Sequence, residues 1–134
     1  MNVVWLYLIS LPILALLDLA WIAGIAHEYY TSQLGTLLSN NPVWPAIIAF
    51  YILYAAGLVF FAVLPAVAVR SLARAILSGA FFGLVAYGTY DLTNLATTAG
   101  WPLVMSFVDM AWGALAGGLT SGIVFYIAST FLTL

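Results

Sequence analysis

Three aspartates are the residues of this sequence whose type and position most clearly suggest chemistry. Asp18, Asp91 and Asp109 each lie within a long apolar stretch, although the chain has only four acidic residues, two basic residues and one histidine. An ionised carboxylate at the centre of a membrane helix costs about 2.5–3.5 kcal/mol, and such residues usually mark a proton, ion or substrate site. The sequence therefore predicts an acidic site inside a membrane.

The three aspartates are expected to share one depth. Each lies eight residues from the expected outer end of its helix, which we place near positions 26, 99 and 101. At 1.5 Å per residue, this puts each carboxyl group about 12 Å below the outer surface. Two of the helices run outward and one runs inward, so sequence spacing alone does not force this agreement.

Aromatic and amide side chains share the helical faces of the aspartates. Tyr87 and Asn94 lie on the face of Asp91, and a D-[LM]-A-W motif places a tryptophan three residues after Asp18 and again after Asp109. Such a repeated motif is what an inverted repeat would leave. The predicted site for a proton or ligand consists of Asp18, Asp91, Asp109, Asn94, Tyr87, Trp21 and Trp112, with Tyr54 from the remaining apolar stretch.

No basic side chain is expected near the aspartates. Arg70 and Arg74 lie together in one short connection, and His27 follows the first apolar stretch. Carboxylates that share a desolvated site repel one another. We therefore expect at least one aspartate to be protonated at neutral pH, or a cation to lie among them, with neutral Tyr, Trp and Asn donors binding any carboxylate that stays ionised.

The composition excludes several other kinds of chemistry. The chain has no cysteine and no lysine, so it has no thiol nucleophile, iron–sulfur cluster or lysine Schiff base. Its single histidine excludes a multi-histidine metal centre within one chain. We predict no metal site and no cofactor, and two basic residues make nucleic acid an unsuitable partner.

The elements that must position the aspartates are transmembrane helices. The chain is 66% hydrophobic and 4% charged, whereas soluble domains carry about 25% charged residues. Its apolar runs are continuous and predict four spans in one domain of residues 1–134, at about 4–26, 44–69, 75–99 and 103–131. The predicted fold is all-α: a polytopic, antiparallel bundle of four transmembrane helices within the lipid bilayer.

The stretch between the first two spans predicts a short interfacial helix. Tyr30, Leu34, Leu37 and Leu38 recur there at helical spacing, which suits a helix lying at the membrane surface. The two arginines lie in the connection between spans two and three, so the positive-inside rule places that connection and both termini in the cytoplasm.

Small residues mark helix faces that can approach closely. The Gly-x-x-x-Gly motifs at 79–83, 113–117 and 118–122 are typical of tightly packed membrane helices. They could pack within one chain or form the seam of a homo-oligomer, and the motif does not decide between the two.

Several segments resemble an uncharacterised family of small bacterial inner-membrane proteins, classed as a domain of unknown function. The resemblance rests on Gly83–Thr97 (GLVAYGTYDLTNLAT), Trp101-Pro102, Val108–Gly113, Asp18–Trp21, Tyr29-Tyr30, Gln33–Gly35 and Trp44-Pro45. It implies four helices in a bacterial inner membrane and supplies no activity. Genes of this family commonly lie near those of fatty-acid-modifying enzymes, which favours a connection with lipids.

Three functions fit these observations. In the first, the acidic site binds a proton, a small cation or a lipid-like amphiphile in a binding or transport protein. In the second, the chain is a membrane-embedded lipid-modifying enzyme or a subunit of one, in which one aspartate is the general acid and an ionised partner the base. In the third, protonated aspartates only join helices by hydrogen bonds. The first needs the fewest additional parts, and whether the protein is an enzyme stays open.

Overall fold

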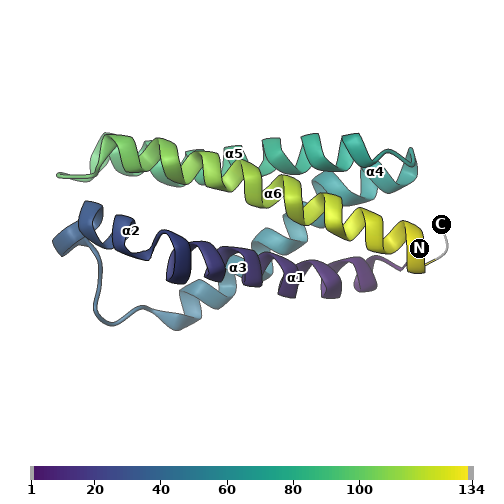
Figure 1. The fold of residues 1–134 in the computed structure, drawn as a ribbon, viewed down its shortest axis with the longest axis horizontal. Coiled ribbons are helices and arrows are strands. Elements are labelled where there is room, and N and C mark those ends of the chain that lie inside the picture. The colour runs from purple at the N-terminus through teal and green to yellow at the C-terminus, as the bar shows by residue number, and fades with distance from the viewer. Residues whose placement is uncertain (1, 133–134) are drawn as a thin grey trace.

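Four long helices carry the chain back and forth in a computed structural model that describes residues 2–132 (Figure 1). The elements are α1 (Val3–Leu19), η1 (Ala20–Ile25), α2 (His27–Leu34), η2 (Gly35–Leu37), α3 (Trp44–Leu58), η3 (Val59–Val63), α4 (Leu64–Ala68), α5 (Leu72–Thr97) and α6 (Leu103–Phe131). Two of them, η1 and η3, are π-helical turns that continue α1 and α3 without a break.

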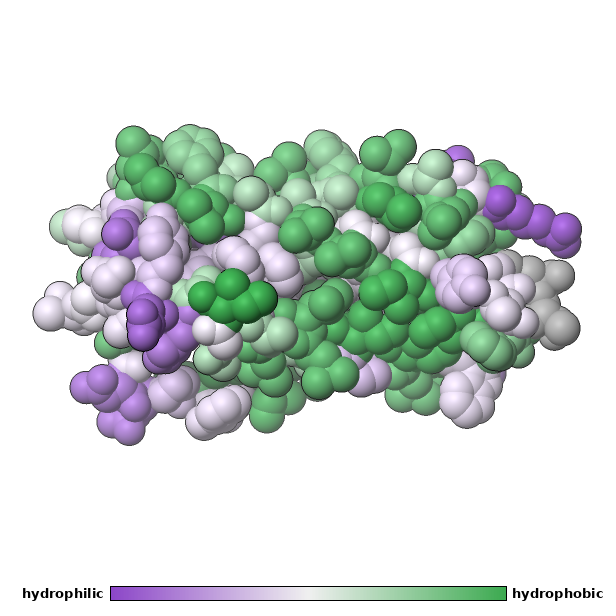
Figure 2. All heavy atoms as spheres, viewed as in Figure 1, coloured by the Kyte–Doolittle hydropathy of each residue, from purple (hydrophilic) through white to green (hydrophobic). Residues whose placement is uncertain are grey.

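The bundle is antiparallel, with α5 and α6 side by side and α1 and α3 packed beneath them (Figure 1). The start of α1, the α4–α5 turn and the end of α6 lie at one end, and α2 and the α5–α6 turn lie at the other. Four helices are long and apolar enough to cross a membrane, at Val3–Ile25, Trp44–Ala68, Leu72–Thr97 and Leu103–Phe131. Figure 2 shows apolar side chains covering the middle of the visible face, with hydrophilic residues gathered toward its ends. The predicted all-α polytopic bundle is confirmed.

Glycines set the closest helix contact, between α5 and α6. A Cβ atom added to Gly79 would meet the backbone of Gly117, and one added to Gly83 would meet the backbone of Gly113. Gly118, in the third small-residue motif, also faces α5 through the carbonyl of Ile76. All three predicted motifs therefore serve a contact within the chain, which lets the two backbones touch.

At one or both ends, the first three spans differ by one to three residues from the sequence prediction, and the short helix α2 also differs. The third span begins at Leu72 rather than residue 75, because the Ser71 hydroxyl accepts the Arg74 N–H at 3.1 Å and caps the helix. The short helix α2 ends at Leu34, where Gly35 adopts a φ of 52°. The expectation that Leu37 and Leu38 continue this helix is wrong, since a 3-10 turn of Gly35–Leu37 follows it.

The second span, which consists of α3, η3 and α4, stays continuous through Pro65. Proline has no N–H for the carbonyl one turn earlier, and its ring crowds that carbonyl. The chain responds with the wide η3 turn immediately before α4, in which Pro65 occupies the first turn. This second span therefore keeps its length while its backbone widens near the middle of the bundle.

Enlarging a glycine at the α5–α6 contact is expected to destabilise the protein. In Gly117→Ala the new methyl group meets the Gly79 carbonyl, so the helices must separate or shift, at a cost of about 1–3 kcal/mol. The matched control is Gly24→Ala, because a Cβ atom there meets nothing within 4 Å. Thermal unfolding in detergent should show a lower midpoint for Gly117→Ala alone, and equal midpoints would contradict this packing.

Candidate functional site

Asp18 is bound by three neutral donors from three helices. The Trp112 indole N–H donates to Asp18 Oδ1 at 3.0 Å, and the Tyr87 hydroxyl donates to the same oxygen at 3.3 Å. The Tyr51 hydroxyl donates to Oδ2. Asp18 is only 3% exposed, and both of its oxygens accept hydrogen bonds. This arrangement fits an ionised carboxylate, which accepts hydrogen bonds and donates none.

Asp91 and Asp109 form a carboxyl pair between α5 and α6. Their side chains are neighbours in the interior of the bundle. Asp91 is fully buried, and neither of its oxygens has a hydrogen-bond partner. Two carboxylates in contact cannot both be ionised, because like charges at this distance repel strongly. One proton on the pair removes the repulsion and makes the hydrogen bond.

Tyr30 connects this pair to the short helix α2. Its hydroxyl donates to Asp109 Oδ1 at 2.8 Å and accepts the indole N–H of Trp21 at 3.1 Å. Burial raises the pKa of Tyr30 above its ordinary value, so the hydroxyl keeps its proton and remains a donor. The hydrogen bond from Tyr30 favours the ionised form of Asp109, because a carboxylate is the better acceptor.

Two stacked tryptophans lie between the Asp18 cluster and the carboxyl pair. The Trp21 and Trp112 rings are 4.7 Å apart and nearly parallel, with an angle of 8° between them. Trp112 donates directly to Asp18, whereas Trp21 reaches Asp109 through Tyr30. Each tryptophan of the repeated D-[LM]-A-W motif therefore interacts, directly or through Tyr30, with the aspartate of the other motif. The antiparallel run of α1 and α6 gives this exchange an approximate local two-fold arrangement (Figure 1).

The π turn η1 positions α2 over the carboxyl pair. It begins two residues after Asp18, and its last hydrogen bond joins the Ala26 N–H to the Trp21 carbonyl at 2.8 Å. One extra residue in a turn rotates everything that follows by about 100° relative to a regular helix. Such turns occur frequently at functional sites. Here the rotation accompanies the burial of Tyr30 against Met105 in one apolar cluster.

The structure brings most of the predicted site residues together. Six of them form one connected network: Asp18, Asp91, Asp109, Tyr87, Trp21 and Trp112. Tyr54 packs beside this network, with its ring 6.1 Å from that of Tyr87, but its buried hydroxyl has no hydrogen-bond partner. Asn94 does not take part, because its amide donates to the Tyr90 carbonyl and accepts from Thr98 on its own helix.

Two contacts of the aspartates were not predicted from the sequence. Tyr51 lies at the predicted depth in the second span but was not assigned to the site, and it donates to Asp18. Tyr30 was assigned only to an interfacial helix, and it donates to Asp109 across 79 positions of sequence. Helical periodicity cannot reveal a contact between separate elements. The one available signal was the tyrosine pair that closely follows Trp21.

A metal centre is not what this geometry provides. Within residues 2–132, no three His, Cys, Asp or Glu side chains come together closely enough to hold a metal ion. Asp18 binds its own donors, and only Asp91 and Asp109 are in contact. The arrangement favours a shared proton over a multidentate cation site.

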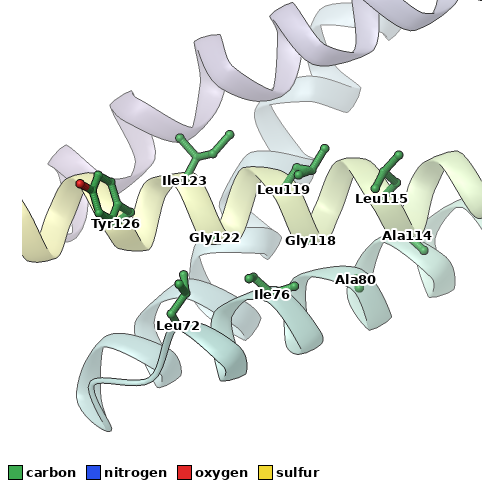
Figure 3. Close-up of a pocket in the computed structure, with 10 residues that line it drawn as sticks. All are labelled: Leu72, Ile76, Ala80, Ala114, Leu115, Gly118, Leu119, Gly122, Ile123 and Tyr126. Carbon is green, nitrogen blue, oxygen red and sulfur yellow. The ribbon is translucent and has the colours of Figure 1, made fainter.

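An apolar groove lies apart from the aspartates, toward the other end of α5 and α6 (Figure 3). Its volume is about 570 Å³, and its walls include Leu72, Ile76, Leu119 and Ile123. The only hydroxyl among the lining residues is that of Tyr126. The groove offers no acid or base, so the chemistry of the molecule is concentrated at the aspartate network.

Fold and network define a polytopic helical membrane protein with a carboxyl cluster in its interior. The chain belongs to the family described as Predicted membrane protein (DUF2177), which matches residues 3–126. No curated protein and no solved structure matches it. The expected relationship to an uncharacterised membrane family is thereby confirmed, and function must be argued from the site.

Removing the indole donor to Asp18 is expected to destabilise the protein. Trp112→Phe keeps an aromatic ring against Trp21 but leaves Asp18 Oδ1 with one donor instead of two. Losing a hydrogen bond to a buried charged group costs about 1–3 kcal/mol. Trp101→Phe is the control, because the buried Trp101 Nε1 has no partner to lose. Unfolding in detergent measures both variants, and an equal effect of the two would contradict an ionised Asp18.

Proposed function

We propose that this protein binds and exchanges a proton at the Asp91–Asp109 pair, and that it uses this exchange to drive binding or transport across a bacterial inner membrane. The observation that carries the proposal is the direct contact of the two buried carboxyl groups, with neutral donors around them. Holding two aspartates together in an apolar bundle is costly unless a proton is bound. A change in the distance between them changes the affinity for that proton.

The contact between helices supports this coupling. Asp91 lies on α5 and Asp109 on α6, so the shared proton joins two different membrane helices. When the proton leaves, repulsion favours a conformation in which the two helices separate at this level. Proton binding is then linked to helix position, and a transporter requires such a link between a bound ion and a conformational change.

Tyr30 supplies the point of control on the outer side. It lies on α2, outside the four spans, and it covers Asp109 while Trp21 holds its hydroxyl. Proton exchange with that side requires the Tyr30–Asp109 hydrogen bond to break. The arginines lie near the α4–α5 turn, at the end of the bundle opposite Tyr30. By the positive-inside rule they favour a cytoplasmic location for that end.

Replacing either member of the pair is expected to abolish proton movement. The full chain is reconstituted in liposomes that contain a pH-sensitive dye, and a potassium diffusion potential drives protons inward. Proton uptake should exceed that of empty liposomes for the wild type. It should fall to the level of empty liposomes for Asp91→Asn and Asp109→Asn, because an amide cannot take up the exchanged proton.

The matched control is Glu28→Gln, which removes an exposed carboxyl group in the first turn of α2. This variant should conduct like the wild type. Wild-type uptake equal to that of empty liposomes, or unchanged uptake in both aspartate variants, would contradict the proposed function.

A further inference from the structure

Thr120 and Ser121 differ from the other hydroxyl side chains of the membrane helices. Ser10, Thr89 and Thr97 each donate to a carbonyl one turn earlier on their own helix, which is the usual arrangement in an apolar environment. The hydroxyls of Thr120 and Ser121 are fully buried and have no partner. A buried hydroxyl without a hydrogen bond costs about 1–3 kcal/mol, so these two groups require a further partner.

The register of α1 against α6 places Ser10 at the level of Thr120. Asp18 binds Trp112, and Leu14 shares a core cluster with Ala116. Toward the other end, Leu6 and Val124 share a second cluster. From one facing pair to the next, the residue number therefore falls by four along α1 and rises by four along α6. The position between the clusters pairs Ser10 with Thr120, and both side chains are fully buried.

Tyr54 lies between this level and the aspartates. Its hydroxyl fills the space beside Gly83 and Gly117, where either glycine would otherwise carry a side chain, and it has no hydrogen-bond partner. Ser121 similarly lies against Gly79, at the next contact of α5 with α6. The unpartnered hydroxyls thus follow the glycine contact away from the carboxyl pair.

We propose that the buried hydroxyls of Ser10, Thr120, Ser121 and Tyr54 form a second site, which holds water molecules and passes protons between the aspartate network and the end of the bundle where the helix α1 begins. The proposal rests on the proposed function, for which it supplies an inner route. Ser10 lies eight residues from Asp18, or about 12 Å along the helix. Bound water is the partner that this level favours, because hydroxyl groups carry no charge to balance a cation and a water molecule satisfies two to four polar groups.

The transfer along this route conserves protons at each step. A hydroxyl or water donates its own hydrogen to the next acceptor while it receives one from the preceding donor. Tyr87, which donates to Asp18, lies next to Tyr54, so the route reaches the aspartate network at Asp18. No oxidant, reductant or leaving group is involved.

An apolar layer closes the inner end of this route in the observed conformation. Leu6, Val59, Val63, Val124 and Ala128 form a buried cluster beyond Ser10 and Thr120. Two of these side chains come from the π turn η3, where the backbone is wider than in a regular helix. The second site therefore lies between this apolar layer and the aspartates, and opening of the layer would connect it to the solvent.

The test measures how fast deuterium replaces the proton of the carboxyl pair. Infrared spectroscopy of the reconstituted full chain follows the C=O band of the protonated aspartate after transfer into D₂O. Thr120→Val removes the hydroxyl and keeps the shape of the side chain, and it should slow the exchange several-fold. Thr120→Ser restores the hydroxyl and should restore the rate. Thr97→Val is the matched control, since its exposed hydroxyl bonds its own helix, and it should exchange like the wild type.

Ser121→Ala probes the same site through a second hydroxyl and should also slow the exchange, whether or not Thr120→Val folds. A protonated-aspartate band with the wild-type rate in both variants would overturn the second site and leave the proposed function standing. A wild-type spectrum without that band would contradict both proposals.

Discussion

The arrangement of this molecule depends on one electrostatic constraint: three carboxyl groups lie inside an apolar bundle, and the side chains that donate hydrogen bonds to them within residues 2–132 are neutral. The donors that reach them are the phenols of Tyr30, Tyr51 and Tyr87 and the indole of Trp112, all of them neutral. Neutral donors can stabilise one carboxylate, as at Asp18, but they cannot cancel the repulsion between two carboxylates in contact. A proton on the Asp91–Asp109 pair satisfies this constraint with no additional side chain.

The helix packing brings these two carboxyl groups near one another. Glycines bring the α5 and α6 backbones together at Gly83 and Gly113, and farther along the same contact Asp91 lies about two turns from Gly83 and Asp109 about one turn from Gly113. At such a separation, side chains as short as aspartate meet. The close backbone approach therefore stabilises the packing of α5 against α6 along most of their contact, and it creates a proton site at one end of that contact. A change in helix spacing and a change in protonation are two consequences of the same movement.

Sequence reasoning predicted the helical bundle and most members of the network, because each depends on information within a single helix. Burial of Asp109 and Trp112 follows from their shared face, and α6 is the most buried of the four described spans. Asn94 shares the face of Asp91 by spacing but bonds Tyr90 and Thr98, since a short amide near a helix end finds partners on its own helix first. Periodicity does not encode such competition.

Contacts between separate elements could not be predicted from the sequence. The rotation introduced by η1 carries Tyr30 over Asp109, and a π turn leaves no clear composition signal in Ala20–Ile25. The repeated D-[LM]-A-W motif did signal a relation between α1 and α6. Only the stacking of Trp21 on Trp112 showed that each motif serves the aspartate of the other.

The central claim is that Asp91 and Asp109 hold a shared proton at neutral pH, and infrared spectroscopy with ¹³C-labelled aspartate tests it most directly. The label shifts the C=O band of a protonated aspartate and separates it from that of glutamate. The account predicts a protonated-aspartate band at pH 7 in the wild type that disappears in Asp91→Asn. A wild-type spectrum at pH 7 in which all three aspartates are ionised would contradict it.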